Sequence, residues 1–247
     1  MDQLLIALDV ESASKAVALA DTLRGVAGGF KIGSRLFTSE GPAIVRALVD
    51  KGDRVFLDLK FHDIPNTVAQ AVAAATSLGV WMVNVHAAGG RKMMSAACDA
   101  AKETAARAGT PAPLVIAVTV LTSMTPDALA ETGYLNRQTA EPAQRCSLLD
   151  QVVRLARLSE AAGLDGVVAS PQETATLRKS CGKGFAIVTP GIRGGGATAG
   201  SRDDQERTMS AGEAITAGAN YIVVGRPIIA AADPRSAAEA ILTNAEC

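Results

Sequence analysis

Short runs of apolar, mostly branched residues alternate along the chain with longer segments in which apolar residues recur at helical spacing. This alternation is typical of repeated strand–helix units that build a parallel sheet. The eight predicted strands cover residues 4–10, 29–33, 54–60, 81–86, 114–120, 166–169, 186–190 and 221–225. The predicted helices cover residues 12–24, 40–51, 66–78, 92–107, 148–162, 171–179, 210–217 and 234–243, and several end at a glycine, as helix C-termini often do.

Eight such units predict a closed (β/α)8 TIM barrel, in which residues 1–247 form a single domain. The alternative is an open, doubly wound sheet, which normally carries a G-x-G-x-x-G motif after its first strand. Asp9-Val10-Glu11-Ser12 stands there instead. The barrel is therefore favoured, and its functional residues are expected at the carboxyl ends of the strands.

Composition narrows the class of protein further. A hydrophobic content of 48% with only 3% aromatic residues suits close packing of helices on strands and excludes a disordered chain. The net charge is -1 and the basic residues are spread along the chain, so nucleic acid is not an expected partner. No apolar run approaches the roughly 18 residues of a membrane span, and no basic leader opens the chain. The cysteines form no C-x-x-C pair, so we expect a reducing, cytoplasmic setting.

The third predicted strand ends in alternating charges. Asp58 and Lys60 lie two residues apart, so on a strand they point to the same face. Asp63 follows where the strand gives way to a loop, ahead of a helix that Pro65 can open. Burying an ion costs several kcal/mol, so such a pair is either a well-satisfied structural bridge or a group that performs chemistry.

Other strand ends add polar groups to the same rim of the barrel. Asp9 lies at the end of the first strand, Lys31 lies in the second, and His86 ends the fourth. The only histidines are His62 and His86, and neither is placed at a ligand spacing, so no metal is predicted. His86 is interpreted as a structural residue, and the role of His62 is left open.

Two loops offer a glycine beside an arginine, Pro190-Gly191-Ile192-Arg193 after the seventh strand and Gly225-Arg226 after the eighth. Loops at these two positions of the fold commonly bind phosphate through backbone N–H groups and basic side chains. The glycine-rich segment 194–205 lies between them. It is either an unstructured loop or, as we expect from its position, a lid with Gln205 at its far hinge.

The stretch from Asp58 to Thr67 resembles the signature of the orotidine 5'-monophosphate decarboxylases in their bacterial form. The resemblance to this family covers nearly the whole chain. The chain is also similar to it at Leu8-Asp9, Phe30 to Gly33, Val118 to Ser123, Pro190 to Arg193, Asp204-Gln205 and Gly225 to Pro227. It implies a cofactor-free decarboxylation of orotidine 5'-monophosphate to UMP and CO2, the final step of de novo pyrimidine nucleotide biosynthesis. It also implies a homodimer with shared active sites.

The resemblance implies a role for each matching residue. Lys31, Asp58, Lys60 and Asp63 would form an alternating charged tetrad, to which Asp63 comes from across the dimer interface. The other substrate-binding residues that it implies are Ile64 and Thr67 across the same interface, Asp9 at the ribose, Thr122 and Ser123 near the pyrimidine, Arg193, Gln205, Gly225 and Arg226 around the phosphate, and Pro190.

The chemistry of the residues agrees with this hypothesis. Loss of CO2 from C6 leaves a vinylic carbanion, and the sequence shows no anchor for an electron-sink cofactor. An ammonium fixed beside C6 by carboxylates can stabilise the carbanion and then protonate it, which assigns Lys60 as the proton donor.

Two other classes of function stay open on the sequence. A Mg2+-dependent sugar-phosphate decarboxylase or aldolase would need a further carboxylate near Lys31, and none follows until Glu40. A non-catalytic phosphate-binding barrel would be expected to have lost part of the tetrad, which is complete here.

Overall fold

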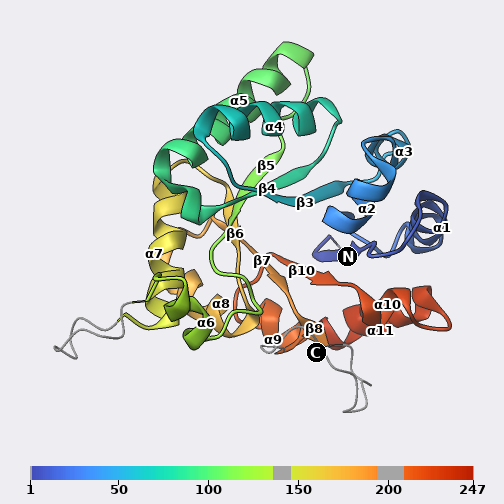
Figure 1. The fold of residues 1–247 in the computed structure, drawn as a ribbon. Helices are drawn as coiled ribbons and strands as arrows, with labels where there is room; N and C mark the ends of the chain where they lie inside the picture. The colour runs from blue at the N-terminus through green and yellow to red at the C-terminus, as the bar shows by residue number, and fades with distance from the viewer. Residues whose placement is uncertain (1, 136–145, 194–208, 247) are drawn as a thin grey trace.

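The computed structural model describes residues 2–135, 146–193 and 209–246, and in it eight parallel strands close into a barrel (Figure 1). Around the barrel the strands follow the order β1-β10-β7-β6-β5-β4-β3-β2. Their bounds are β1 (Leu4–Ala7), β2 (Gly29–Gly33), β3 (Val55–Phe61), β4 (Met82–His86), β5 (Leu114–Val118), β6 (Gly166–Val168), β7 (Ala186–Pro190) and β10 (Tyr221–Val224). The predicted TIM barrel and all eight predicted strands are confirmed.

Helices follow the strands and surround the barrel (Figure 1). Their bounds are α1 (Ala13–Leu23), α2 (Ser34–Glu40), α3 (Ala43–Val49), α4 (Pro65–Ser77), the 3-10 turn η1 (Ala87–Gly89), α5 (Gly90–Ala108), α6 (Pro126–Glu131), α7 (Leu148–Ala161), α8 (Pro171–Ser180), α9 (Ala211–Thr216), α10 (Arg226–Ile229) and α11 (Pro234–Glu246). A small extra sheet pairs β8 (Ile192–Arg193) with β9 (Met209–Ser210).

The helix predicted at residues 40–51 is present as the shorter α3, but the helix before it, α2, was not predicted. Gly41, with a φ of 67°, ends α2. Pro42 then opens α3, because its fixed φ suits the start of a helix. The short helices α6 and α10 were also not predicted, and Arg226 therefore begins a helix rather than lying in a loop.

Several helices begin at a serine whose side chain caps them. The Ser12 hydroxyl accepts a hydrogen bond from the Lys15 backbone N–H at the start of α1. A reciprocal capping box joins Ser147 and Asp150 at the start of α7. Such caps satisfy N–H groups that the helix itself leaves without partners, so they fix where each helix leaves its loop.

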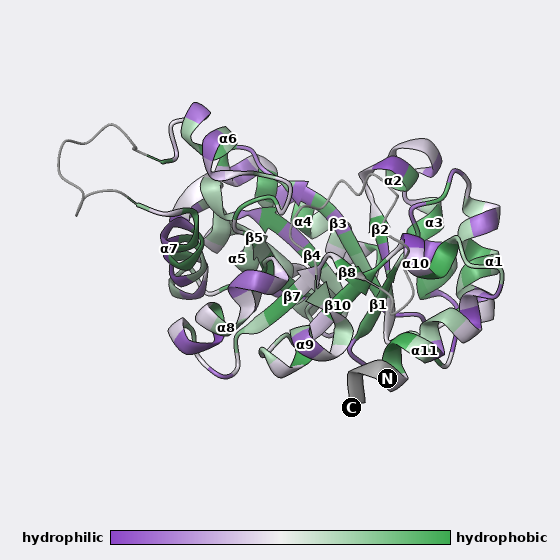
Figure 2. Cartoon of the chain, turned by 90° about the horizontal axis from the view of Figure 1, so that it is seen from below, coloured by the Kyte–Doolittle hydropathy of each residue, from purple (hydrophilic) through white to green (hydrophobic). Residues whose placement is uncertain are grey.

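The apolar core has two parts. Outward-facing strand residues pack under the helices, while a smaller cluster fills the barrel itself, with Leu5, Phe56, Met82 and Ile116 among its members. In Figure 2 the barrel strands are mostly green, whereas purple residues gather on the outer helices and loops. The interior is therefore apolar below the strand ends that carry the charged side chains.

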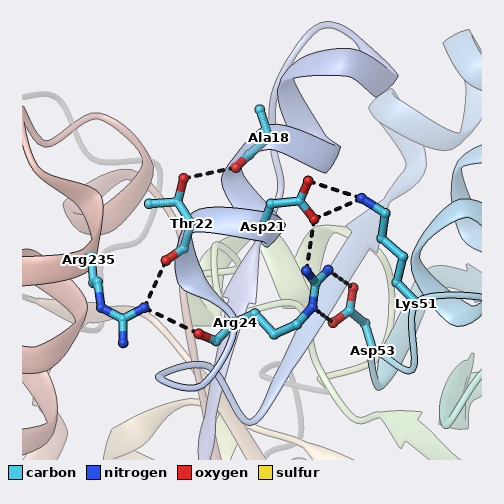
Figure 3. Close-up of polar contacts among 7 residues, drawn as sticks. All are labelled: Ala18, Asp21, Thr22, Arg24, Lys51, Asp53 and Arg235. Carbon is cyan, nitrogen blue, oxygen red and sulfur yellow. Dashed lines mark hydrogen bonds and ion pairs between the residues drawn. The ribbon is translucent and has the colours of Figure 1, made fainter.

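An ion-pair network joins distant parts of the chain at the opposite, amino-terminal end of the barrel (Figure 3). The Arg24 guanidinium donates two hydrogen bonds to the carboxylate of Asp53, at 2.8 and 2.7 Å, and a third to Asp21. Lys51 also donates to Asp21, and Arg235 of α11 donates to the backbone carbonyl of Arg24. This network ties α1 to the segment before β3 and to the last helix.

Two sequence expectations concern the chain as a whole. Cys98, Cys146 and Cys181 lie in the described part of the chain and form no disulfide there. Across the same residues, no helix combines the length and the apolar character that a membrane crossing needs.

Candidate active site

Three charged side chains meet at the carboxyl ends of β2 and β3. Lys60 Nζ donates to Asp58 Oδ1 at 2.6 Å, and Lys31 Nζ lies 3.5 Å from the other carboxylate oxygen, Asp58 Oδ2. Lys31 Nζ also donates to Asp9 Oδ1, at 3.1 Å, from just beyond β1. Lys31, Asp58 and Lys60, three of the four residues of the expected tetrad, therefore lie together in this chain, and Asp9 extends the alternation of carboxylates and ammonium groups beyond Lys31.

Burial decides how these charges behave. Burial by itself would raise the pKa of Asp58, but attraction by Lys31 and Lys60 and hydrogen bonds from Lys60 and Asn84 outweigh it, so the pKa lies below its ordinary value. Asp58 is therefore ionised at neutral pH. The Lys60 side chain is 35% exposed and that of Lys31 only 10%, so Lys60 presents its ammonium group to the open end of the barrel.

The backbone of β3 is unusual at this point. Lys60 has a φ of 55°, and it is the only non-glycine residue with positive φ in the described part of the chain. Its backbone N–H donates to the side-chain oxygen of Asn84 on β4. Asn84 was missed by the sequence analysis, although a polar residue at an inward-facing position of an apolar strand was a signal that could have found it.

Two glycines let the backbone approach the cluster closely. A Cβ at Gly33 would lie 2.9 Å from Lys31 Nζ and 3.3 Å from Asp9 Oδ1. A Cβ at Gly225 would lie 3.8 Å from Asp9 Oδ2. The predicted phosphate loop at Gly225 is thus a neighbour of Asp9.

Asp63, the fourth residue of the predicted tetrad, does not join the cluster within this chain. Its Oδ1 accepts a hydrogen bond from the next backbone N–H, that of Ile64, and among the described residues it forms no ion pair. Ile64 is 67% exposed, and Thr67 is exposed in the first turn of α4. These three residues form an outward-facing edge beside the site.

The remaining predicted residues that the structure describes lie at the same end of the barrel. Thr122 is half-buried and Ser123 exposed in the turn after β5, Pro190 ends β7, and Arg226 is exposed at the start of α10. Arg193 is the last residue of β8. The Arg193 side chain, Gln205 and the predicted lid at 194–205 lie outside what the structure describes.

The two histidines lie together beside the cluster, with ring centroids 5.4 Å apart. Burial, followed by electrostatic interaction with His62 and Lys60, lowers the pKa of His86, against a smaller opposing effect of Asp58. His86 is therefore neutral at neutral pH. Within residues 2–135, 146–193 and 209–246, no three histidine, cysteine or acidic side chains group as a metal site would require.

Comparison with known sequences gives a match over almost the whole chain. The family model described as "Orotidine 5'-phosphate decarboxylase / HUMPS family" matches residues 2–241. A protein of Moorella thermoacetica named orotidine 5'-phosphate decarboxylase is 50% identical over 99% of this chain and 92% of its own length. Another of that name, from Chromohalobacter salexigens, is 52% identical over 95% of this chain and 92% of its own length.

Solved structures match the fold over the same extent. Orotidine 5'-phosphate decarboxylase from Lactobacillus acidophilus superposes with a TM-score of 0.81 at 34% identity, covering 99% of both chains. An uncharacterized conserved protein from Geobacillus kaustophilus gives 0.80 at 36% identity, covering 98% of this chain and 99% of its own.

Proposed function

The chain belongs to the orotidine 5'-phosphate decarboxylase / HUMPS family and is a carboxy-lyase of pyrimidine biosynthesis, and we propose that it works without a cofactor, with Lys60 as the proton donor. The substrate would be orotidine 5'-monophosphate and the products UMP and CO2. The observation that carries this proposal is the contact between Asp58 and Lys60, which fixes an accessible ammonium group at the open end of the barrel.

The proposed step breaks one bond and forms one. The bond between C6 and the carboxylate breaks, CO2 leaves, and the electron pair stays on C6. A proton then passes from Lys60 Nζ to C6, and solvent later returns a proton to the amine. Before that transfer, the positive charge of Lys60 stabilises the developing carbanion.

Asp58 and Lys31 prepare Lys60 for this role. Asp58 holds the Lys60 ammonium group in place, because its Oδ1 accepts a hydrogen bond from Lys60 Nζ. Lys31 neutralises the second oxygen of Asp58 and links it to Asp9, which we assign to the ribose. All of these groups are held on rigid strands or directly after them, as accurate positioning requires.

The phosphate of the substrate is remote from C6 and supplies binding energy that positions the pyrimidine ring. We assign it to the loops after β7 and β10, the usual phosphate site of this fold. The residues involved would be Pro190, Arg193, Gln205, Gly225 and Arg226, with Thr122 and Ser123 nearer the pyrimidine. The approach of Gly225 to Asp9 supports one continuous site for ribose and phosphate.

We further propose a homodimer in which each active site takes Asp63 from the partner subunit, together with Ile64 and Thr67. The exposure of Ile64 supports this, because a large aliphatic side chain gains most from burial against a partner. The lack of an ion pair for Asp63 among the described residues of its own chain agrees with it. Cys98, Cys146 and Cys181, which are unpaired within the described part of the chain, agree with a cytoplasmic setting.

The direct test is to treat the purified protein with EDTA, dialyse it, and follow conversion of orotidine 5'-monophosphate to UMP in the ultraviolet. Undiminished turnover is expected. If turnover appeared only after Mg2+ was added, the metal-dependent sugar-phosphate class would be favoured instead. If wild-type protein formed no UMP under either condition, the proposed function would be wrong.

A further inference from the structure

The pairing of β3 with β4 is irregular at the charged cluster. Leu57 pairs with Val83, but the next pair along the two strands is Phe61 with Val85. The segment of β3 between these pairs is 58–60, and on β4 Asn84 alone stands opposite it. This bulge carries both Asp58 and Lys60, so their positions depend on whatever holds it in place.

Asn84 holds the bulge through its backbone. The bulge gives Lys60 its φ of 55°, a conformation that residues with a side chain rarely adopt without support. The Lys60 N–H has no strand partner in the regular ladder and donates instead to Asn84 Oδ1 at 2.8 Å. Asn84 is fully buried, with an exposure of 0%, so no water competes for this bond.

The other end of the same amide holds the carboxylate. Asn84 Nδ2 donates to Asp58 Oδ1 at 2.7 Å, and that oxygen also accepts from Lys60 Nζ. The two partners fix which way the amide points, because a backbone N–H can only donate and a carboxylate can only accept. An asparagine supplies the required acceptor and donor at this distance, whereas an aliphatic side chain supplies neither.

We propose that Asn84 is the positioning residue of the proton-transfer step, because one buried amide fixes both the backbone of Lys60 and the carboxylate that holds its ammonium group. This inference rests on the proposed function and deepens it. Asn84 touches no reacting atom. Its effect is expected on kcat, with little effect on the affinity for UMP, whose ribose and phosphate are assigned to other strands.

The test compares two substitutions of similar size. In Asn84→Asp one carboxylate oxygen still accepts a hydrogen bond from the Lys60 backbone N–H. The other oxygen faces Asp58 Oδ1, so two negatively charged carboxylates repel each other where a donor and an acceptor met before. Such a pair shares a proton as the pH falls, and the shared proton restores the missing donor. Asn84→Leu has neither donor nor acceptor at any pH.

Asn220→Asp is a matched control at the far end of the barrel. Asn220 Oδ1 accepts hydrogen bonds from the Ile187 N–H and from Arg178, and a carboxylate oxygen can accept both.

Other groups near Asn84 titrate or carry charge, and they include Lys31 beyond Asp58, His86 on the same strand and His62 beside it. On the β5 side the paired residue is Ile116, which is apolar.

Because these neighbouring groups are present in both proteins, the quantity to measure is the ratio of variant kcat to wild-type kcat between about pH 5.5 and pH 8. Titrations common to both proteins cancel in this ratio. UMP affinity is measured on each variant by calorimetry.

Both Asn84 variants are expected to lose about 100-fold in kcat near pH 8 with UMP affinity within about threefold of wild type. The ratio should rise as the pH falls for Asn84→Asp only, and Asn220→Asp should match wild type throughout. If Asn84→Asp failed to bind UMP, the test would rest on Asn84→Leu. An Asn84→Leu variant that binds UMP but has lost kcat would support the positioning role of Asn84.

The inference is overturned if both variants keep wild-type kcat, if their ratios show the same pH dependence, or if neither binds UMP, since Asn84 would then hold the barrel rather than the lysine. These outcomes differ from failure of the proposed function, in which the wild-type protein itself forms no UMP.

Discussion

Asp58 lies between two ammonium groups, with Lys60 Nζ 2.6 Å from its Oδ1 and Lys31 Nζ 3.5 Å from its Oδ2. The two lysines are not equivalent, because Lys31 is buried and also bound to Asp9, whereas Lys60 is open to the mouth of the barrel. Lys31 therefore holds the cluster together, and Lys60 is available to a substrate.

Gly33 tests how closely the cluster is packed. Its φ of -93° suits any residue, so Gly33→Ala is not strained in the backbone. The new Cβ would instead meet Lys31 Nζ at 2.9 Å, and because this atom ends a flexible side chain, the lysine moves and the fold is kept. We expect kcat/KM to fall about tenfold or more.

The control for this substitution is Gly184→Ala. A Cβ at Gly184 has no other atom within 4 Å, so the variant should match wild type in kcat/KM. An active Gly33→Ala variant, with kcat/KM near that of wild type, would show that Lys31 need not occupy its observed position.

Arg226 tests the assignment of the phosphate site. A guanidinium group binds phosphate with two charge-assisted hydrogen bonds, so Arg226→Ala should weaken UMP binding by about 10- to 100-fold and leave uridine binding unchanged. Calorimetry with the two ligands measures the difference. Arg235→Ala, on α11 at the other end of the barrel, is the control and should bind UMP normally. Equal losses for UMP and uridine in Arg226→Ala would refute the assignment.

His86 predicts a pH dependence of stability. Its pKa in the folded protein lies below the ordinary value of 6.5, mainly because of burial. As the pH falls below about 6.5, the unfolded chain binds a proton that the folded protein resists, so the free energy of unfolding decreases. Urea unfolding of His86→Gln should therefore show a shallower decrease between about pH 7.5 and pH 5.5 than wild type. Identical slopes for the two proteins would contradict the lowered pKa.

The shared active site is tested by mixing two inactive variants, Lys60→Ala and Asp63→Asn, under conditions that let subunits exchange. If Asp63 serves the partner's site, each heterodimer has one site with both lesions and one with neither. Random pairing then restores about a quarter of all sites. If Asp63 served its own chain's site, every site would keep one lesion. Absence of recovery, with exchange confirmed by mass, would exclude the shared site.

The sequence was sufficient to predict the barrel, because each strand is a short apolar run that is followed by a segment with helical spacing. Both patterns are local and can be recognised from neighbouring residues alone. The sequence was insufficient at residues 34–40, where the helix α2 was missed because it ends at Gly41 after only seven residues, too few to show a clear helical period. Short helices such as α10 were missed because four residues hold too little periodicity to be seen.

The site shows the same limit. Asp58 and Lys60 were found because charges are conspicuous at the end of an apolar strand. Asn84 was not found, since its importance comes from a register shift between β3 and β4 that no single segment reveals. The position of Asp63 relative to an active site depends on a second chain, so it stays a prediction.

The most direct test of the account is Lys60→Ala. General acid catalysis by a positioned group contributes about 100- to 10,000-fold, and Lys60 also stabilises the carbanion, so we expect kcat to fall at least about 1,000-fold. UMP should still bind, because ribose and phosphate contacts remain. Lys15→Ala is the control and should retain full activity, because Lys15 is an exposed lysine that pairs with Glu11 on the surface. A Lys60→Ala protein that kept a substantial share of wild-type kcat would show that Lys60 is not the proton donor.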